Sequence, residues 1–263
     1  MERVRAVTLE EARAFHADFY GPQSGNLVVV GDFDPAEIRP VLEGAFGDWA
    51  SPHAFARIPE PFGDPPPEDV SIETPDKANA VLLVQQNLEL TDADEDFPAL
   101  ALAGYALGGG PLNSRLARRI RVESGLSYTV GGQIGAHPID PVGQFLAFAI
   151  FAPENLQKVE EAFRDEVAEV LAEGFTDEEI ETARRGYLET RQLSRAQDAS
   201  LSSQIASHLY FDRSFAYDAD FEAAVRALST AEVNEALRRH LDLSKMTFVK
   251  AGDFGSGSPP IGP

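Results

Sequence analysis

The spacing of apolar and polar positions along the chain predicts helices interspersed with short strands. Apolar residues recur every three or four positions in some segments, as in amphipathic helices, and alternate or run together in others, as in strands. Helices are predicted over residues 8–19, 34–46, 97–107, 112–121, 155–172, 176–196, 201–211, 221–227 and 230–241. Strands are predicted over residues 26–30, 69–74, 78–87, 126–133, 144–151 and 246–251.

Three of the predicted helices begin with recognisable capping residues. Thr8 and Thr176 each stand three positions before a Glu, which is the pattern of a capping box. Asp34 precedes Pro35, and proline suits the first position of a helix because no hydrogen bond is lost there. These signals predict where the three helices start.

Five prolines fall between residues 59 and 67. Proline has no backbone N–H and fits neither a helix interior nor a central strand. We therefore expect an extended linker over residues 56–68. Residues 255–263 are rich in Gly, Ser and Pro and are expected to form a disordered tail.

A pattern of helix, strand and then Gly-Asp-Phe occurs near both ends of the chain. Thr8 matches Thr230 at an offset of 222 residues, and Gly31 matches Gly252 at an offset of 221. An internal repeat with a period close to the chain length would explain both matches. Chance similarity of two helix–strand units is the alternative.

If the repeat is real, the sequence begins partway through the first of two similar domains. Residues 69–254 then form one complete domain, and residues 1–55 are the closing helix–strand–helix segment of a similar upstream domain. Either an upstream segment has been removed, or another chain supplies it.

The chain is strongly acidic and contains no cysteine. Its 22 Lys and Arg against 43 Asp and Glu give a net charge of −21, which argues against nucleic-acid binding and disfavours anionic membranes. The longest apolar run, residues 145–152, is far too short to span a bilayer. We expect a soluble protein, located in either the cytoplasm or the periplasm. An acidic interior would favour basic peptides as substrates.

The histidines show no metal-binding spacing. No His-x-x-x-His or His-x-x-Glu-His pair occurs, and no Gly-x-Ser-x-Gly sequence is present. Structural roles are therefore expected for His16, His208 and His240, and no metal-ligand role is expected for these or for His53 and His137.

The segment with the most candidate functional residues begins with the glycine run Gly108, Gly109 and Gly110, and a helix is predicted after it. Glycines let another backbone approach closely, and the free N–H groups of a helix start favour anions or carbonyl oxygens. A phosphate-binding function is the weaker interpretation, because neither a P-loop lysine nor a dinucleotide fingerprint is present. A tight structural turn is equally compatible with the residues.

Four arginines follow within seven positions, and the last of them is Arg121. Gly125 is placed to end this helix in the left-handed conformation, so that the next strand starts near Tyr128. An adjacent Arg and Tyr could hold a substrate carbonyl and stabilise a developing oxyanion. A solvated helix face paired with nearby acids is the alternative.

Residues 107–128 read LGGGPLNSRLARRIRVESGLSY and resemble the second half of the M16 zinc peptidases, the family of insulinase, pitrilysin and mitochondrial processing peptidase. Residues 20–34 resemble the closing strand of the first half of that family. The resemblance implies an α+β fold, with an antiparallel-rich sheet and helices packed on one side. It also implies two such halves that close around a peptide.

The resemblance implies roles for particular residues. Arg121 and Tyr128 would act at the active site, and substrate-binding positions would be Gly108, Gly109, Gly110, Ser114 and Arg115. The family's inverted zinc motif, His-x-x-Glu-His, is absent, so we expect no metal in this chain, with zinc carried by a partner half. Ser127, where the family often has Ala, and Pro111 in the glycine loop also depart from its pattern.

The catalytic half could be fused upstream or be a separate chain, and a dimer is compatible with the sequence. On this interpretation the chain binds a peptide substrate but hydrolyses nothing by itself. The alternative function is a non-enzymatic M16-like scaffold or peptide-binding subunit.

Overall fold

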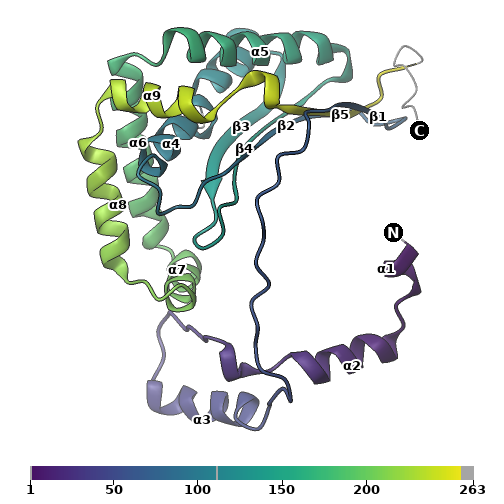
Figure 1. The fold of residues 1–263 in the computed structure, drawn as a ribbon, viewed down its shortest axis with the longest axis vertical. Helices are drawn as coiled ribbons and strands as arrows, with labels where there is room; N and C mark the ends of the chain where they lie inside the picture. Colours follow the sequence, from purple (N-terminus) through teal and green to yellow (C-terminus); the bar gives the residue numbers. More distant parts are fainter. Residues whose placement is uncertain (1, 111, 256–263) are drawn as a thin grey trace. The chain divides into compact units, whose positions relative to one another are not determined.

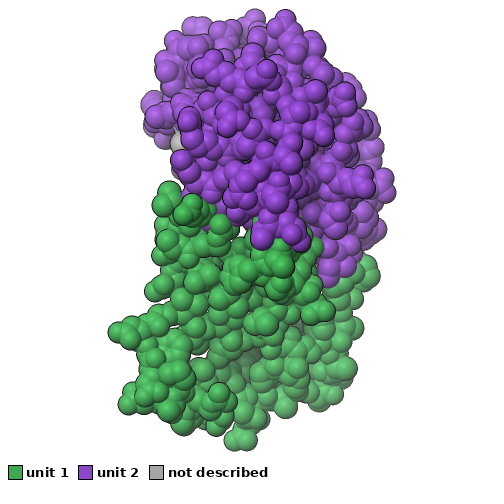
Figure 2. All heavy atoms as spheres, turned by 90° about the vertical axis from the view of Figure 1, so that its left-hand side faces the viewer, with its two compact units in different colours: residues 1–59, 192–218 green, residues 60–191, 219–263 purple. Residues whose placement is uncertain are grey.

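The computed structural model of the chain describes residues 2–110 and 112–255 (Figure 1). The chain divides into two compact units, coloured separately in Figure 2. Residues 1–59 and 192–218 form the first unit, and residues 60–191 and 219–263 form the second.

The second unit is built on a five-stranded sheet with the order β1-β5-β2-β4-β3 (Figure 1). Only the pair β1–β5 is parallel, and the other three pairs are antiparallel. The strands are β1 (Asp69–Glu73), β2 (Ala80–Leu88), β3 (Ser127–Ala136), β4 (Gly143–Phe151) and β5 (Thr247–Gly252). The five strands predicted over this region are confirmed, with ends shifted by at most three residues.

Helices cover one face of this sheet. Alternate residues of β2 and β4, such as Leu82 and Phe145, are buried under them, and Phe163 packs edge-on against Phe248. The helices of this unit are α4 (Phe97–Gly104), α5 (Leu156–Glu173), α6 (Asp177–Arg195), α8 (Phe215–Ala227) and α9 (Thr230–His240), of which α6 and α8 run on into the first unit. Short helical turns are η2 (Tyr105–Gly109), η3 (Ala117–Glu123), η4 (Pro153–Asn155) and η5 (Leu243–Lys245). The expected α+β fold is confirmed.

The opposite face of the sheet is more open. Ile72, Val81 and Phe148 are 41%, 38% and 39% exposed, respectively, although the neighbours of Val81 in β2 and of Phe148 in β4 are buried. The proline-rich segment before β1 runs along this unit as an extended trace, and Asn87 donates a hydrogen bond of 2.9 Å to the carbonyl of Gly63. Residues 56–68 contain neither helix nor strand, and their role as a linker stays a prediction.

The first unit contains α1 (Glu2–Ala6), α2 (Leu9–Phe19), η1 (Pro22–Ser24), α3 (Pro35–Phe46) and α7 (Asp198–Tyr210). Thr8 and Asp34 cap α2 and α3 as predicted, and Thr8 forms the full capping box with Glu11. No residue of α2 or α3 is buried, and His16 stacks between the rings of Tyr20 and Trp49. This unit therefore has little core of its own.

Three sequence predictions are corrected by the structure. The strand predicted over residues 26–30 is wrong, because no strand of the described residues lies beside it to complete a hydrogen-bonded ladder. The helix predicted over 112–121 becomes helical only at Arg115 and then widens into the π-helical η3. The helix predicted over 221–227 begins six residues earlier, at Phe215. Apart from Gly255, the expected disordered tail lies outside the described residues.

The helix and the short turn of the repeat recur in the structure, with one change of register, but its strand does not. The N-cap that matches Thr8 is Ser229 and not Thr230, because the Ser229 side chain accepts the Glu232 N–H in a second capping box. With this correction α2 and α9 are both 11 residues long at an offset of 221, and η1 matches η5 at the same offset. The segment matching β5 is residues 26–31, which is extended but unpaired.

The run of α4 into η2 lies unusually close to the edge strand β3. A Cβ atom on Gly104 would stand 2.7 Å from the backbone nitrogen of Ile134, and one on Gly108 would stand 2.6 Å from that of Gly132. Neither distance can be relieved by turning a side chain, since the obstructing atoms are backbone. The glycines are therefore needed for close contact between helix and strand.

Replacing Gly108 with Ala tests this contact. Gly-to-Ala changes in helices usually stabilise a protein by about 1 kcal/mol. We expect Gly108→Ala to destabilise by about 1–3 kcal/mol instead, because β3 must move away. Urea unfolding followed by circular dichroism measures the change. Gly135→Ala is the control, since a Cβ there meets nothing within 4 Å. A stabilised Gly108→Ala protein would contradict the assigned packing.

Candidate functional site

Arg121 lies near the end of η3, where the chain turns toward β3. Gly125 adopts a φ of +62°, and the N–H of Leu126 donates a 2.9 Å hydrogen bond to the carbonyl of Ile120. This is the left-handed termination predicted for Gly125, and it is confirmed. It brings the chain from Arg121 directly into the strand that carries Tyr128.

Tyr128 is the extra residue of a β-bulge at the start of β3. The register with β4 passes from Ser127 opposite Phe151 to Thr129 opposite Ile150, so Tyr128 has no partner in the ladder. Bulges redirect a side chain and are frequent beside functional sites. The Tyr128 side chain is 62% exposed.

Arg121 is exposed as well. In the described part of the chain, neither Arg121 nor Tyr128 takes part in a hydrogen bond or an ion pair. Both polar groups therefore remain free to contact a ligand. Arg121 lies in η3 and Tyr128 in β3, which follow one another along the chain, and their joint action on a ligand stays a prediction.

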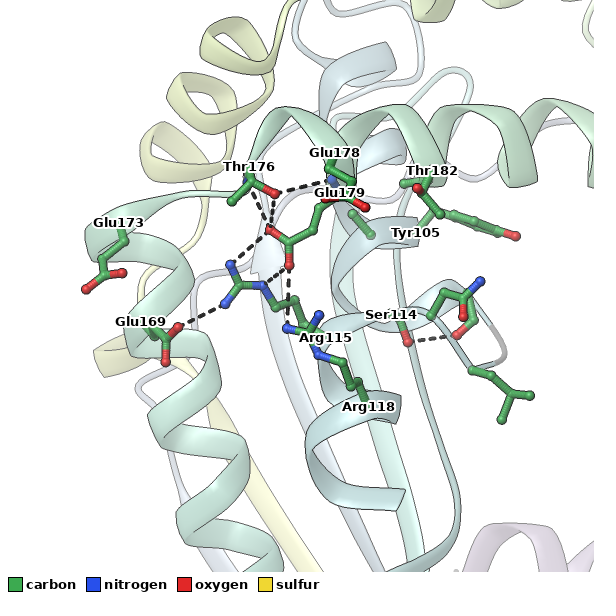
Figure 3. A pocket seen from close by; sticks show the side chains of 15 residues that line it. Tyr105, Ser114, Arg115, Arg118, Glu169, Glu173, Thr176, Glu178, Glu179 and Thr182 are labelled. Carbon is green, nitrogen blue, oxygen red and sulfur yellow. Dashed lines mark hydrogen bonds and ion pairs between the residues drawn. The ribbon is translucent and has the colours of Figure 1, made fainter. Parts of the chain in front are cut away.

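Arg115 has a different environment (Figure 3). Its side chain is only 10% exposed, and its guanidinium nitrogens lie 3.2, 3.0 and 2.6 Å from carboxylate oxygens of Glu166, Glu169 and Glu179, respectively. It also donates a hydrogen bond of 3.4 Å to the carbonyl of Gly174. Arg115 thus joins the start of η3 to both α5 and α6.

This charge cluster changes the pKa values of its members. Burial raises the pKa of Glu166 above its ordinary value, and the pairing with Arg115 offsets only part of the rise. Burial also acts to raise the pKa of Glu179, but hydrogen bonds from Thr176 and Arg115 outweigh it, so that pKa is lowered. Burial and pairing with Arg115 therefore act in opposite directions on the pKa values of these two carboxyl groups, and pairing with hydrogen bonding prevails only at Glu179.

The glycine loop is held by internal contacts. The Ser114 hydroxyl donates a hydrogen bond of 2.7 Å to the carbonyl of Gly110, and Ser114 is 1% exposed. Gly108 packs on β3, and a Cβ on Gly109 would stand 3.1 Å from the Tyr105 ring. The substrate contacts expected of Gly108–Gly110, Ser114 and Arg115 stay predictions, and the side chains of Ser114 and Arg115 are already engaged inside the protein.

A cavity of about 630 Å³ opens beside this loop (Figure 3). It is lined in part by residues not expected from the sequence, namely Tyr105, Asn113, Glu173, Glu178 and Thr182. They come from segments 105–118 and 169–183, which only the tertiary fold brings together. One signal was available for the Arg115 partners: the three-residue spacing of Glu166 and Glu169 places both on one helix face.

The described residues do not fit a catalytic zinc site. Among residues 2–110 and 112–255, no group of three or more His, Cys, Asp or Glu side chains could hold a metal ion. His208 lies 3.0 Å from Asp218, and His240 lies 2.9 Å from Asp96, so both histidines are engaged in local pairs. In the same ranges, no helix is both long and apolar enough to cross a membrane.

The fold and the site together define a class of domain. It has an antiparallel-rich sheet, helices on one face, and an exposed Arg and Tyr next to the edge strand. The family model of the peptidase M16 inactive domain matches residues 6–187. The chain belongs to this family, and the resemblance seen in its sequence is confirmed.

Two curated relatives differ in their described activity. The chain is 26% identical over 190 residues to an uncharacterized zinc protease of Streptomyces coelicolor, covering 68% of this chain and 39% of that protein. It is 23% identical over 199 residues to the non-peptidase homolog YmxG of Helicobacter pylori, covering 69% and 44%. The chain thus spans less than half the length of these relatives.

Solved structures share the fold over nearly the whole chain. A peptidase M16 inactive domain from Pseudomonas fluorescens superposes with a TM-score of 0.77 at 26% identity, covering 98% of this chain and 60% of that one. A protease from Helicobacter pylori gives 0.73 at 16% identity, covering 96% and 60%. The second likeness concerns the fold alone.

Replacing Arg115 with Met tests its structural role. The change leaves buried carboxylates without a counter-charge, so we expect a loss of about 3–5 kcal/mol in unfolding free energy at pH 7.5. Without Arg115 the carboxylate pKa values rise above their unfolded values, so the loss should shrink as the pH falls toward 5. Urea unfolding at both pH values measures it. Arg119→Met, at an exposed position of the same helix, should change stability little; equal losses in the two variants would refute the role.

Proposed function

We propose that this chain is the substrate-binding, non-catalytic half of an M16-type zinc metalloendopeptidase. On this proposal Arg121 and Tyr128 act at the active site of a zinc-bearing partner half. The observation that carries it is the bulged, exposed and unpaired Tyr128 at the start of the edge strand, seven residues after Arg121. Membership of the inactive-domain family supports the same role.

The chemistry follows from the two side chains. The Tyr128 hydroxyl donates a hydrogen bond to the scissile carbonyl oxygen as that oxygen becomes an oxyanion. The Arg121 guanidinium holds the peptide backbone beside it and reinforces the stabilisation of the same charge. Hydrogen-bond donors aimed at a developing charge are often the largest single contribution to catalysis. The metal and its ligands belong to the partner half.

Within residues 1–55, the repeated stretch 8–31 supplies the contact with that partner half. By the offset of 221, Leu27 matches Phe248 and Tyr20 matches Leu241. The second member of each pair is buried, at 1% and 4%, whereas Leu27 and Tyr20 are 57% and 54% exposed. This segment has the form of a closing helix and strand without the sheet that would cover them.

Replacing Leu27 with Asp tests this contact. We expect association with a separately produced zinc-bearing half to weaken by about tenfold or more, because a charge would enter the buried interface. Analytical ultracentrifugation measures the affinity. Val41→Asp is the control, since Val41 is 66% exposed and lies outside the repeated stretch. Equal effects of the two changes would contradict the docking.

Replacing Tyr128 with Phe tests the catalytic role. In the assembled two-half enzyme we expect kcat to fall by about 10²–10³, the usual loss for one oxyanion donor. Tyr210→Phe is the control, because Tyr210 is 47% exposed on α7 and also keeps its ring. An unchanged kcat for Tyr128→Phe would reject the role.

A non-enzymatic scaffold or peptide-binding subunit is the second candidate. It is favoured by the similarity to YmxG, which is described as a non-peptidase homolog. The assembled two-half protein distinguishes the candidates: peptide cleavage that a chelator abolishes supports the peptidase, and its absence with peptide binding retained supports the scaffold.

A further inference from the structure

The bulge at Tyr128 changes which side chains of β3 face the core. In a regular strand, residues three positions apart point to opposite faces of the sheet. Ser127 and Val130 are three positions apart, yet both are buried, at 8% exposure each. The extra residue accounts for this, because β4 advances only from Phe151 to Ile150 while β3 advances from position 127 to 129. The bulge therefore buries a hydroxyl group directly before Tyr128.

A buried hydroxyl needs a hydrogen-bond partner, since burying it without one is costly. The Ser127 hydroxyl donates a hydrogen bond of 2.7 Å to the carbonyl of Thr129. This bond starts on one side of Tyr128 and ends on the other, so it closes a ring across the bulge. Ala, which the family often has at this position, has no hydroxyl and cannot form the bond.

The residue before the bulge is held as well. The N–H of Leu126 donates to the carbonyl of Ile120 at 2.9 Å, and the carbonyl of Leu126 accepts a hydrogen bond of 3.3 Å from the Asn155 side chain. Asn155 is the last residue of η4, which follows β4. The start of β3 is therefore tied to a segment far away in the sequence.

Tyr128 contrasts with the residues around it. Its side chain is 62% exposed and makes no hydrogen bond within the described ranges. The direction in which the side chain leaves the strand is thus set by the backbone of the bulge, and that backbone is held from positions 126, 127 and 129. Precise placement matters at an active site, because a displacement of about 1 Å can slow a reaction by about 10².

We infer that Ser127 and Asn155 are positioning residues for Tyr128, holding the bulge so that its hydroxyl stays aimed at the developing oxyanion. Both act through Tyr128 and neither contacts the substrate. A donor that is already oriented needs no rearrangement during the reaction, which is why preorganised donors are effective. This inference rests on the proposed function and adds to it the two side chains that prepare the same site.

The isolated full chain tests whether these side chains hold the bulge. Labelling with ¹⁵N-tyrosine marks the backbone amides of the six tyrosines, and the signal lost in Tyr128→Phe belongs to Tyr128. We expect its amide order parameter, measured by NMR relaxation, to be about 0.85, as in rigid backbone. It should fall toward about 0.6 in Ser127→Ala and also in Asn155→Ala, while the other five signals keep their values.

Ser203→Ala is the matched control for this measurement. The Ser203 hydroxyl also donates to a backbone carbonyl, that of Ala199 at 2.9 Å, but it lies on α7. We expect its loss to leave the order parameter of Tyr128 unchanged. A Tyr128 amide that stays equally rigid in Ser127→Ala and Asn155→Ala overturns the inference.

Kinetics of the assembled two-half enzyme test whether the positioning serves catalysis. Ser127→Ala should lower kcat about fivefold and leave KM within about twofold, because the Tyr128 hydrogen bond strengthens only in the transition state. In a Tyr128→Phe background the same change should alter kcat by less than about 1.5-fold, since the hydroxyl to be positioned is gone. An equal fall of kcat in both backgrounds would show that Ser127 acts independently of Tyr128, and the inference would be rejected.

The outcome is separable from that of the proposed function. If Tyr128→Phe leaves kcat unchanged, the catalytic role falls, while the order parameters of the isolated chain still decide whether Ser127 and Asn155 hold the bulge. If Tyr128→Phe slows cleavage but Ser127→Ala and Asn155→Ala change neither kcat nor the order parameter, the proposed function stands and this inference falls.

Discussion

The close contact between the run of α4 into η2 and the edge strand β3 is the constraint on which the rest of the site depends. It requires glycine at positions 104 and 108, four residues apart, so that both face the strand. It fixes where β3 lies, and with it the bulge that turns Tyr128 outward. It also fixes where the chain leaves η2 to form the glycine loop, so the loop and the edge strand are set by one packing contact.

Arg115 and Arg121 show how burial divides similar residues into different roles. They lie six residues apart near the same turn of chain, yet one is surrounded by three carboxylates and the other is exposed without a partner. Removing a charge from water is favourable only when counter-charges and hydrogen bonds replace the solvent. Arg115 meets that condition and joins helices, while Arg121 remains available to a ligand. Some of the chain's acidic side chains thus pair with a basic residue inside the protein.

In the first unit too, contacts between distant residues decide which structure a local sequence pattern adopts. Its helix α2 and turn η1 reproduce α9 and η5 at a constant offset of 221 residues. In the second copy the matching apolar positions, such as Leu241 and Phe248, are buried; in the first, Tyr20 and Leu27 are exposed. A strand is completed only by its neighbours, so the same local sequence pattern yields β5 in one place and an unpaired extended segment in the other.

The sequence by itself determined the elements whose signals are local. Capping residues such as Thr8 and Asp34, the left-handed Gly125 and the apolar periodicity of most helices depend only on near neighbours along the chain, and they were predicted correctly. The motif around Arg121 and Tyr128 identified the family for the same reason. Only the tertiary structure decided that β3 lies at an edge of the sheet, that Tyr128 is bulged, and that Arg115 is buried among carboxylates from two other helices. These features arise from pairing and burial between residues far apart in the chain, where no local pattern specifies the partner.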